Sequence, residues 1–129
     1  GEVVKLARPE TRVIAAEPAV AALLSGSPFA SHKIQGWTPD FVPGVLNRKV
    51  PDRIVTVADQ EAIDAARSLA KSEGIFCGIS SGATFAAAVK VAAEAPPGSA
   101  ILAMLPDTGE RYLSTPLFEG VPEGSDPEP

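Results

Sequence analysis

Hydrophobic residues occur along this chain in short continuous runs that predict buried strands. Residues 12–17 and 53–57 are runs of strand length, and the second is rich in β-branched side chains. Residues 100–105 form another continuous apolar run, and residues 75–77 are a very short strand candidate. Strands that are apolar throughout, rather than alternately apolar and polar, are typical of parallel sheets that helices cover.

Apolar residues at helical spacing lie between these runs. One apolar stripe consists of Ala62, Ala65, Ala66, Leu69 and Ala70. We expect Asp59 to be the N-cap of this helix, Glu61 to favour the helix dipole from the first turn, and Gly74 to end the helix with a positive φ. A second helix is expected to begin at residue 81 or 82 and to end near residue 95, before two prolines.

The order strand, helix, strand, helix, strand predicts an α/β fold with a mostly parallel sheet and helices on both faces. Shorter helical segments are expected at residues 2–7 and 19–24. Residues 27–50 contain three prolines and two glycines, and they predict a long irregular connection of a kind that is usually functional. The acidic, proline-rich residues 119–129 are expected to form a disordered tail.

Composition and charge argue against several classes of function. The formal net charge is -5 and aromatic residues make up 5%, so neither a phosphate backbone nor stacked bases are expected partners. No apolar run approaches the roughly 20 residues that a membrane span needs, and no leader sequence is recognisable. The single cysteine, Cys77, favours a reducing, cytoplasmic location and is expected to be a buried, inert thiol. One cysteine and one histidine cannot form a structural zinc site, so no metal site is expected.

The segment Gly78-Ile79-Ser80-Ser81-Gly82 fits the G-x-S-x-G pattern of the nucleophilic serine in α/β-hydrolases. However, the only histidine, His32, precedes Ser80, whereas the hydrolase order places the histidine last. Lys90 lies too far along the following helix to act easily as the base. Two other interpretations stay open: Ser80 and Ser81 cap the helix while the glycines serve a tight turn, or the turn is a ligand site at the end of a strand.

Three segments together resemble one enzyme family. They are HKIQGWTPDFVP (32–43), GIFCGISSGAT (74–84) and LPDTGERYLST (105–115), and their order and spacing are similar to those of cysteine synthases, or O-acetylserine sulfhydrylases. Those enzymes are fold-type-II pyridoxal-phosphate (PLP) enzymes. The resemblance covers about residues 1–121 but only the C-terminal part of the family's chain. It implies that residues 1–118 are the C-terminal portion of the synthase domain, and that the PLP-linked lysine and the phosphate loop lie upstream, so that no catalytic residue is expected here.

The resemblance implies roles for five residues. Ser80 matches the serine that donates a hydrogen bond to the pyridine nitrogen of PLP. A hydroxyl leaves that nitrogen neutral, whereas a carboxylate would keep it protonated. Gln35 and Gly36 match a segment that lines the substrate pocket. Asp107 and Thr108 lie in the turn that approaches the ring side of the cofactor, behind the residues that touch it.

The activity that the resemblance implies is a β-replacement, in which sulfide displaces the acetoxy group of O-acetylserine to give cysteine and acetate. Residues 37–41, WTPDF, replace a small-residue segment of the family, which alters the expected shape of the pocket. Alternatives are cystathionine β-synthase or a related enzyme, and a non-catalytic fragment or binding module. The implied partners are a second copy of the chain, serine acetyltransferase and the N-terminal part of the same protein, without which the fragment is expected to be inactive. A structural role, holding the C-terminal segment against the sheet, is expected for Glu110, Arg111 and Tyr112.

Overall fold

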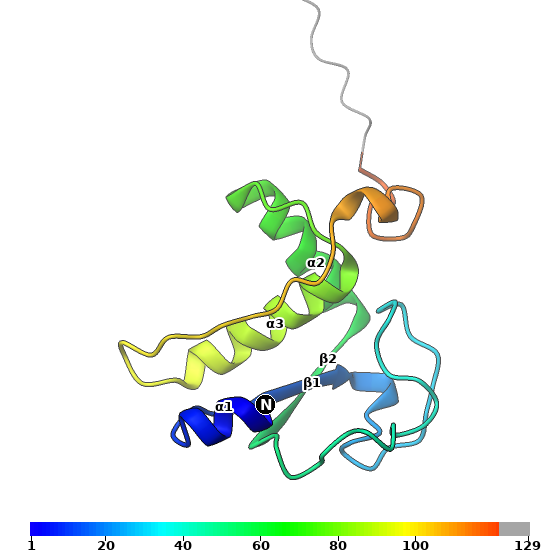
Figure 1. Cartoon of the computed structure of the whole chain (residues 1–129). Coiled ribbons are helices and arrows are strands. Elements are labelled where there is room, and N and C mark those ends of the chain that lie inside the picture. Colours follow the sequence, from blue (N-terminus) through cyan, green and yellow to red (C-terminus); the bar gives the residue numbers. More distant parts are fainter. Residues whose placement is uncertain (122–129) are drawn as a thin grey trace, which may run out of the picture.

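The computed structural model describes residues 1–121, which form two strands, three α-helices and shorter helical turns (Figure 1). In chain order these elements are α1 (Glu2–Ala7), β1 (Ile14–Pro18), η1 (Ala19–Ala21), β2 (Arg53–Val57), α2 (Asp59–Ser68), η2 (Leu69–Glu73), α3 (Ile79–Glu94) and η3 (Gly109–Tyr112). The predicted strands at residues 12–17 and 53–57 and the helix at residues 2–7 are confirmed to within two residues. The predicted tail falls mainly on residues 122–129, which lie outside the described part of the chain, and it stays a prediction.

β1 and β2 are parallel neighbours, with Ile14 opposite Arg53 and Pro18 opposite Val57. The helix α3 contacts both strands and α2 lies along α3, so these two helices stack above the strand pair (Figure 1). This arrangement confirms the predicted α/β class. The apolar cluster between these elements includes Val55 and Val57 of β2, and it continues to Ile34 and Leu117, which are completely buried.

The connection between η1 and β2 is irregular, as predicted, and it is held at its start by a buried carboxylate. Glu17, which is 1% exposed, accepts hydrogen bonds from the backbone N–H groups of Leu24 (2.8 Å) and Ser25 (3.1 Å). The Ser25 hydroxyl donates a further bond to Glu17 (2.5 Å). These bonds explain why residues 19–24 form one short helical turn, η1, and then a reversal instead of a longer helix.

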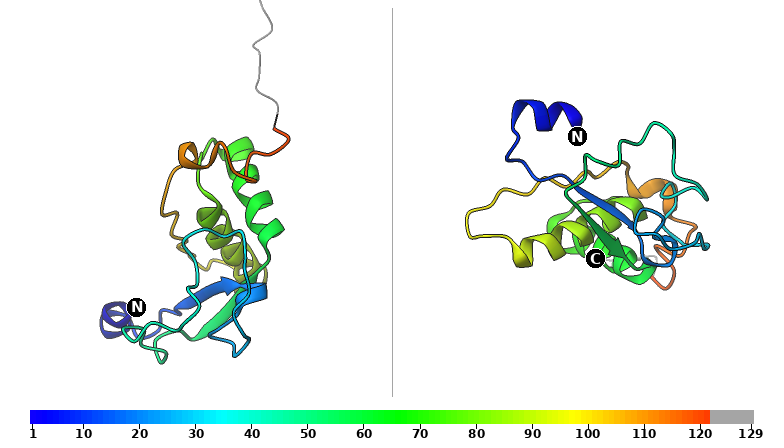
Figure 2. Two further views of the ribbon diagram at one scale, coloured as in Figure 1. Left: turned by 90° about the vertical axis from the view of Figure 1, so that its right-hand side faces the viewer. Right: turned by 90° about the horizontal axis from the view of Figure 1, so that it is seen from below.

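The first helix, α1, stands apart from α2 and α3 (Figure 2) and has no buried residue. It is attached to the rest of the chain mainly by polar contacts. The ammonium of Lys5 lies 2.5 Å from the Asp52 carboxylate, and Glu2 accepts a bond from the Asn47 side chain (2.5 Å). None of the described helices has both the length and the apolar character that crossing a membrane requires.

The predicted strand at residues 100–105 is absent from the described structure. This segment is extended but unpaired, and Leu102 and Met104 are 97% and 71% exposed. A buried parallel strand needs hydrogen-bonded neighbours. Here β1 and β2 pair with each other, while residues 100–105 run back along α3 (Figure 1), so nothing among residues 1–121 provides a neighbouring strand.

Two further local predictions need correction, and a third is confirmed. Residues 75–77 are not a strand; they end in a single antiparallel bridge between Cys77 and Thr108. The N-cap of α2 is Ala58 instead of Asp59, because the Glu61 carboxylate accepts the Ala58 N–H (2.8 Å) and Asp59 accepts the N–H of Lys33 (2.9 Å). The predicted positive φ of Gly74 is confirmed at 68°, at the end of η2.

Candidate functional site

The helix α3 begins at Ile79, two or three residues earlier than predicted, and Gly78 is its N-cap. Ser80 and Ser81 are therefore inside its first turn and are 6% and 0% exposed. Within residues 1–121 no side chain caps this helix. The interpretation in which the two serines serve as caps is thus wrong, because residues that have entered the helix no longer occupy the capping position.

The two glycines of the motif are required for space and not for an unusual backbone angle. Neither Gly78 nor Gly82 has a positive φ. A methyl group at Gly78 would overlap the carboxylate of Asp107 and would lie 2.5 Å from the ring of Tyr112. A methyl group at Gly82 would overlap the backbone of Ala62 in α2. The start of α3 is therefore packed closely on both sides, which corrects the tight-turn interpretation of these glycines.

The Ser80 hydroxyl forms no hydrogen bond with any other described residue, although the Ser80 carbonyl accepts one from Thr84 (3.0 Å). Among residues 1–121, the fully enclosed side-chain atoms without a partner are His32 Nδ1 and Asp59 Oδ1, and Ser80 Oγ is not one of them. Ser80 is therefore a mostly buried residue whose hydroxyl keeps some access and is free to donate. A ligand ring that approaches the start of α3 could accept this bond.

The turn at residues 106–109 lies against the start of α3. The Asp107 carbonyl accepts a bond from the Gly78 N–H (3.3 Å), and the Ser81 hydroxyl lies 3.4 Å from both the carbonyl and the carboxylate of Asp107. Tyr112, in η3, donates its hydroxyl to the other oxygen of the Asp107 carboxylate. The structure thus brings the predicted residues Asp107 and Ser80 into one region, with Ser81 and Gly78 between them.

Three pKa shifts occur in and around this turn. The bond that Tyr112 donates to Asp107 raises the pKa of Tyr112, since ionisation would place two negative charges together. Burial raises the pKa of the Cys77 thiol, and the charge of Asp107 adds to the rise. Thr108 is exposed and donates to the Glu110 carboxylate, which lowers the pKa of Glu110. Thr108 is therefore oriented toward Glu110.

The predicted substrate-pocket residues, Gln35 and Gly36, are exposed and lie in a turn in which the Trp37 N–H donates to the Ile34 carbonyl (3.3 Å). Gly36 has a φ of 83°, which a glycine adopts without strain. Ile34 is buried in the same apolar cluster as Ile79 of α3, and Trp37 packs partly against that cluster. The loop is thus anchored to the core that supports α3, although no hydrogen bond within residues 1–121 joins it to Ser80.

The geometry argues further against a hydrolase. Lys90, the alternative base, donates to the carbonyl of Thr56 (2.9 Å) and to the carboxylate of Glu61 (2.8 Å), at the strand side of α3. His32 contacts Phe29 edge to face, with ring centroids 6.4 Å apart, and has no described contact with Ser80. Within the described residues, no group of three or more metal-ligating side chains comes together. The features that remain are a free hydroxyl and a rigid helix start.

Comparison with known proteins identifies the family. A model of the family described as "Pyridoxal-phosphate dependent enzyme" matches residues 1–107 of this chain. This chain belongs to that family. It is 57% identical over 126 residues to the O-ureido-L-serine synthase of Streptomyces lavendulae, and 43% identical over 118 residues to cysteine synthases of Staphylococcus aureus. These matches cover 98% and 92% of this chain but only 39% and 38% of the relatives.

Solved structures agree with this assignment. The crystal structure of O-ureido-L-serine synthase superposes with a TM-score of 0.92 at 57% identity, covering 97% of this chain and 40% of the other. That of O-acetyl serine sulfhydrylase isoform 3 from Entamoeba histolytica gives a TM-score of 0.88 at 41% identity, covering 96% and 37%. The family and the fold expected from the three sequence segments are confirmed. The chain spans about two fifths of the length of its relatives.

The residues present fit the cofactor of this family on one point. A pyridine nitrogen accepts a hydrogen bond, and Ser80 offers a neutral hydroxyl donor that no other described residue occupies. Sequence reasoning had not identified the link between Tyr112 and Asp107 behind this donor. Its only sequence signal is an acid and a tyrosine five residues apart, which is too common to be informative.

Proposed function

We propose that this chain is part of a PLP-dependent synthase that replaces the leaving group on the β-carbon of an O-activated L-serine. The observation that carries the proposal is the free hydroxyl of the mostly buried Ser80 in the first turn of α3. The family match and the two kinds of synthase among the relatives support this reaction class. PLP, when bound, withdraws electrons from the α-carbon of an amino-acid substrate and so favours loss of the β-substituent.

In this proposal Ser80 donates its hydroxyl hydrogen to the pyridine nitrogen and leaves it neutral. A neutral ring is a weaker electron sink than a protonated one, which suits elimination of a good leaving group and limits side reactions. Burial of Ser80 and Ser81 reduces competition from water for this bond. Gln35 and Gly36 are placed at the substrate pocket, where an exposed amide can bind the carboxylate of the substrate.

The nucleophile is the finer part of the proposal. Sulfide is favoured by the 43% identity to cysteine synthases, and O-acetylserine would then give cysteine and acetate. The 57% identity to O-ureido-L-serine synthase favours N-hydroxyurea instead. In that case the hydroxyl oxygen of hydroxyurea would bond to the β-carbon, the bond from that carbon to the acetoxy oxygen would break, and acetate and one proton would leave. The bulky residues 37–41, with Trp37 packed partly on the core, also favour a nucleophile other than sulfide.

The whole protein is needed for this activity in our proposal. Because the chain spans about two fifths of its relatives, the PLP-linked lysine and the phosphate-binding loop are assigned to the rest of the protein. A homodimer and a complex with serine acetyltransferase are further proposals, and both rest on the family resemblance. The exposed apolar residues 100–105 are proposed to gain strand neighbours from the rest of the protein, since a run of this kind is typical of a buried strand.

The test uses the full-length enzyme, purified with PLP. Wild-type protein is expected to show the absorbance of bound PLP, and to convert O-acetylserine with hydroxyurea or with sulfide to products identified by mass. Ser80→Ala is expected to change the cofactor spectrum and to slow turnover by about 2- to 10-fold, the value of one neutral hydrogen bond. Ser80→Asp is expected to give a different spectrum, because a carboxylate favours the protonated ring.

Ser72→Ala, which removes an exposed hydroxyl from η2, is the matched control and should leave both measurements unchanged. If Ser80→Ala matched wild type in spectrum and turnover, the role of Ser80 would be wrong. Absence of bound PLP from the wild-type protein would contradict the proposed function as a whole. Product formation with only one of the two compounds, sulfide or hydroxyurea, identifies the nucleophile of the enzyme.

A further inference from the structure

Asp107 lies between the start of α3 and the aromatic ring of Tyr112, and it contacts both. Its carbonyl accepts the Gly78 N–H (3.3 Å), one carboxylate oxygen lies 3.4 Å from the Ser81 hydroxyl, and the other accepts the Tyr112 hydroxyl. Tyr112 is 9% exposed, so this bond is shielded from water. A single side chain thus joins η3 to the first turn of α3.

These contacts enclose Ser80 from both directions along the chain. Gly78 is two residues before Ser80, Ser81 is one residue after it, and both are bound to Asp107. Gly78 is also packed so closely that no side chain larger than hydrogen fits beside Asp107 and Tyr112. Because the backbone on each side of Ser80 is fixed, the direction of the Ser80 hydroxyl depends on where Asp107 lies.

Asp107 in turn depends on Tyr112. Asp107 comes directly after an exposed proline, and two hydroxyl groups, those of Tyr112 and Ser81, hold its carboxylate in place. The bond from Ser81 is at the long limit of hydrogen bonding. The Tyr112 bond is therefore the stronger constraint on the carboxylate. Tyr112 itself is anchored, since its carbonyl accepts the N–H (2.9 Å) and the hydroxyl (2.6 Å) of Thr115.

We propose that Tyr112 and Asp107 are positioning residues for the cofactor, which act by aligning the Ser80 hydroxyl with the pyridine nitrogen. This inference rests on the proposed function. Neither residue touches the cofactor in this proposal, because the Asp107 carboxylate is already engaged by Tyr112 and Ser81. Loss of the Tyr112 hydroxyl loosens Asp107 and then the first turn of α3, and the bond from Ser80 to the ring weakens.

The test compares variants of the full-length enzyme reconstituted with PLP. Tyr112→Phe keeps the ring that packs on Gly78 and removes only the hydroxyl. It is expected to shift the absorbance and fluorescence of the cofactor in the same direction as Ser80→Ala, and to lower kcat by about 2- to 10-fold with a smaller change in KM. Ser114→Ala, which removes an exposed hydroxyl two residues further on, is the matched control.

The deciding measurement is the double variant. If Tyr112 acts through Ser80, Tyr112→Phe should have no further effect on the cofactor spectrum once Ser80 is alanine. A purely structural role for Tyr112 would instead add its effect to that of Ser80→Ala. Additive effects, or an unchanged spectrum in Tyr112→Phe, would therefore overturn the inference while the proposed function stands.

A second variant covers the case in which Tyr112→Phe does not fold. Asp107→Asn keeps the size of the side chain and an oxygen that can accept the Tyr112 hydroxyl, whereas Asp107→Ala removes that acceptor. The expected order of spectral change is wild type, Asp107→Asn, then Asp107→Ala, and the reverse order for the two variants would contradict the inference. A wild-type protein that binds no PLP would remove the basis of both proposals.

Discussion

Gly82 of α3 lies directly against the backbone carbonyl of Ala62 in α2, with no room for a side chain between them. Because glycine has no side chain, α2 and α3 approach each other more closely here than they could with any other residue at position 82. Ala62 and Ala66, the neighbours of Gly82 on α2, are 0% and 3% exposed. Since Gly82 is two residues beyond Ser80, the same contact sets the distance of Ser80 from α2.

Replacing Gly82 by alanine is therefore expected to destabilise the protein although alanine favours helices. The added methyl group overlaps the Ala62 carbonyl, and overpacking of this kind costs about 1–3 kcal/mol. Urea unfolding of the full-length protein measures the loss, and Gly44→Ala is the control because nothing lies within 4 Å of Gly44 and its φ is not positive. Equal stability of the two variants would show that α2 and α3 can separate without cost.

The local elements of the fold could be predicted because their signals are contained in short segments. The β-branched run of β2 and the alanine stripe of α2 depend only on neighbouring residues, and both were located correctly. The start of α3 was misplaced because serine favours the N-cap, whereas Gly78 is needed there to make room for Asp107 and Tyr112. The run at 100–105 was misassigned because a strand needs partners that residues 1–121 do not contain.

The candidate site was predictable only in part for a similar reason. Ser80 stood out through its motif, and the resemblance of three segments suggested what its hydroxyl could bind. The bond from Tyr112 to Asp107 forms only because η3 packs near the start of α3, and no short sequence pattern predicts that contact. The role of the two glycines could not be predicted either, since the residues that leave them no room lie 16 to 34 positions away in the sequence.

Thr38 is expected to be a strained residue whose replacement stabilises the substrate loop. It has a φ of 38° and is the one non-glycine residue with a positive φ among residues 1–121. A β-branched side chain in this region costs about 1–2 kcal/mol, whereas asparagine tolerates it. Thr38→Asn should therefore raise the free energy of unfolding by about 1 kcal/mol in urea. Thr11→Asn is the control, and equal effects of the two changes would mean that Thr38 is not strained.

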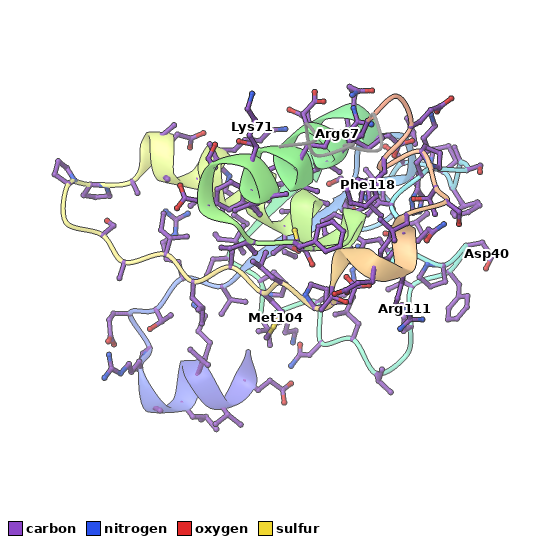
Figure 3. All side chains as sticks on the ribbon, turned by 90° about the horizontal axis from the view of Figure 1, so that it is seen from above. Asp40, Arg67, Lys71, Met104, Arg111 and Phe118 are labelled. Carbon is purple, nitrogen blue, oxygen red and sulfur yellow. The ribbon has the colours of Figure 1, made fainter. Side chains whose placement is uncertain are left out.

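Arg67 is expected to hold the end of the described chain on α2 (Figure 3). Its guanidinium donates to the carbonyls of Leu117 (2.7 Å), Glu119 (2.8 Å) and Pro116 (3.3 Å). A lysine has no planar fork and cannot reproduce these bonds together. Arg67→Lys should lower the free energy of unfolding by about 1–2 kcal/mol and speed proteolysis near residue 117. Arg111→Lys, on the exposed face of η3, should do neither; equal proteolysis of both variants would contradict this role.

Cys77 is expected to be unreactive in the native protein and to make stability fall at high pH. It is 3% exposed, and burial together with the charge of Asp107 raises the pKa of its thiol above the ordinary value of 9.0. At a pH below 9.0 the thiol is protonated in both the folded and the unfolded states, so its ionisation does not change the free energy of unfolding with pH. As the pH rises further, the unfolded state loses the proton first, and the free energy of unfolding decreases until the folded thiol also ionises.

Two measurements check this expectation for Cys77. A disulfide reagent at pH 8 should label the native full-length protein far more slowly at this residue than it labels the protein in urea, because the thiolate is the reactive form and the native thiol is buried. Tyr112, whose pKa is also raised, contributes a decrease of the same sign at high pH, so the comparison must be made with Cys77→Ala. The variant should lose less stability than wild type between pH 8 and about pH 10. An equal loss in the two proteins would show that Cys77 is not responsible.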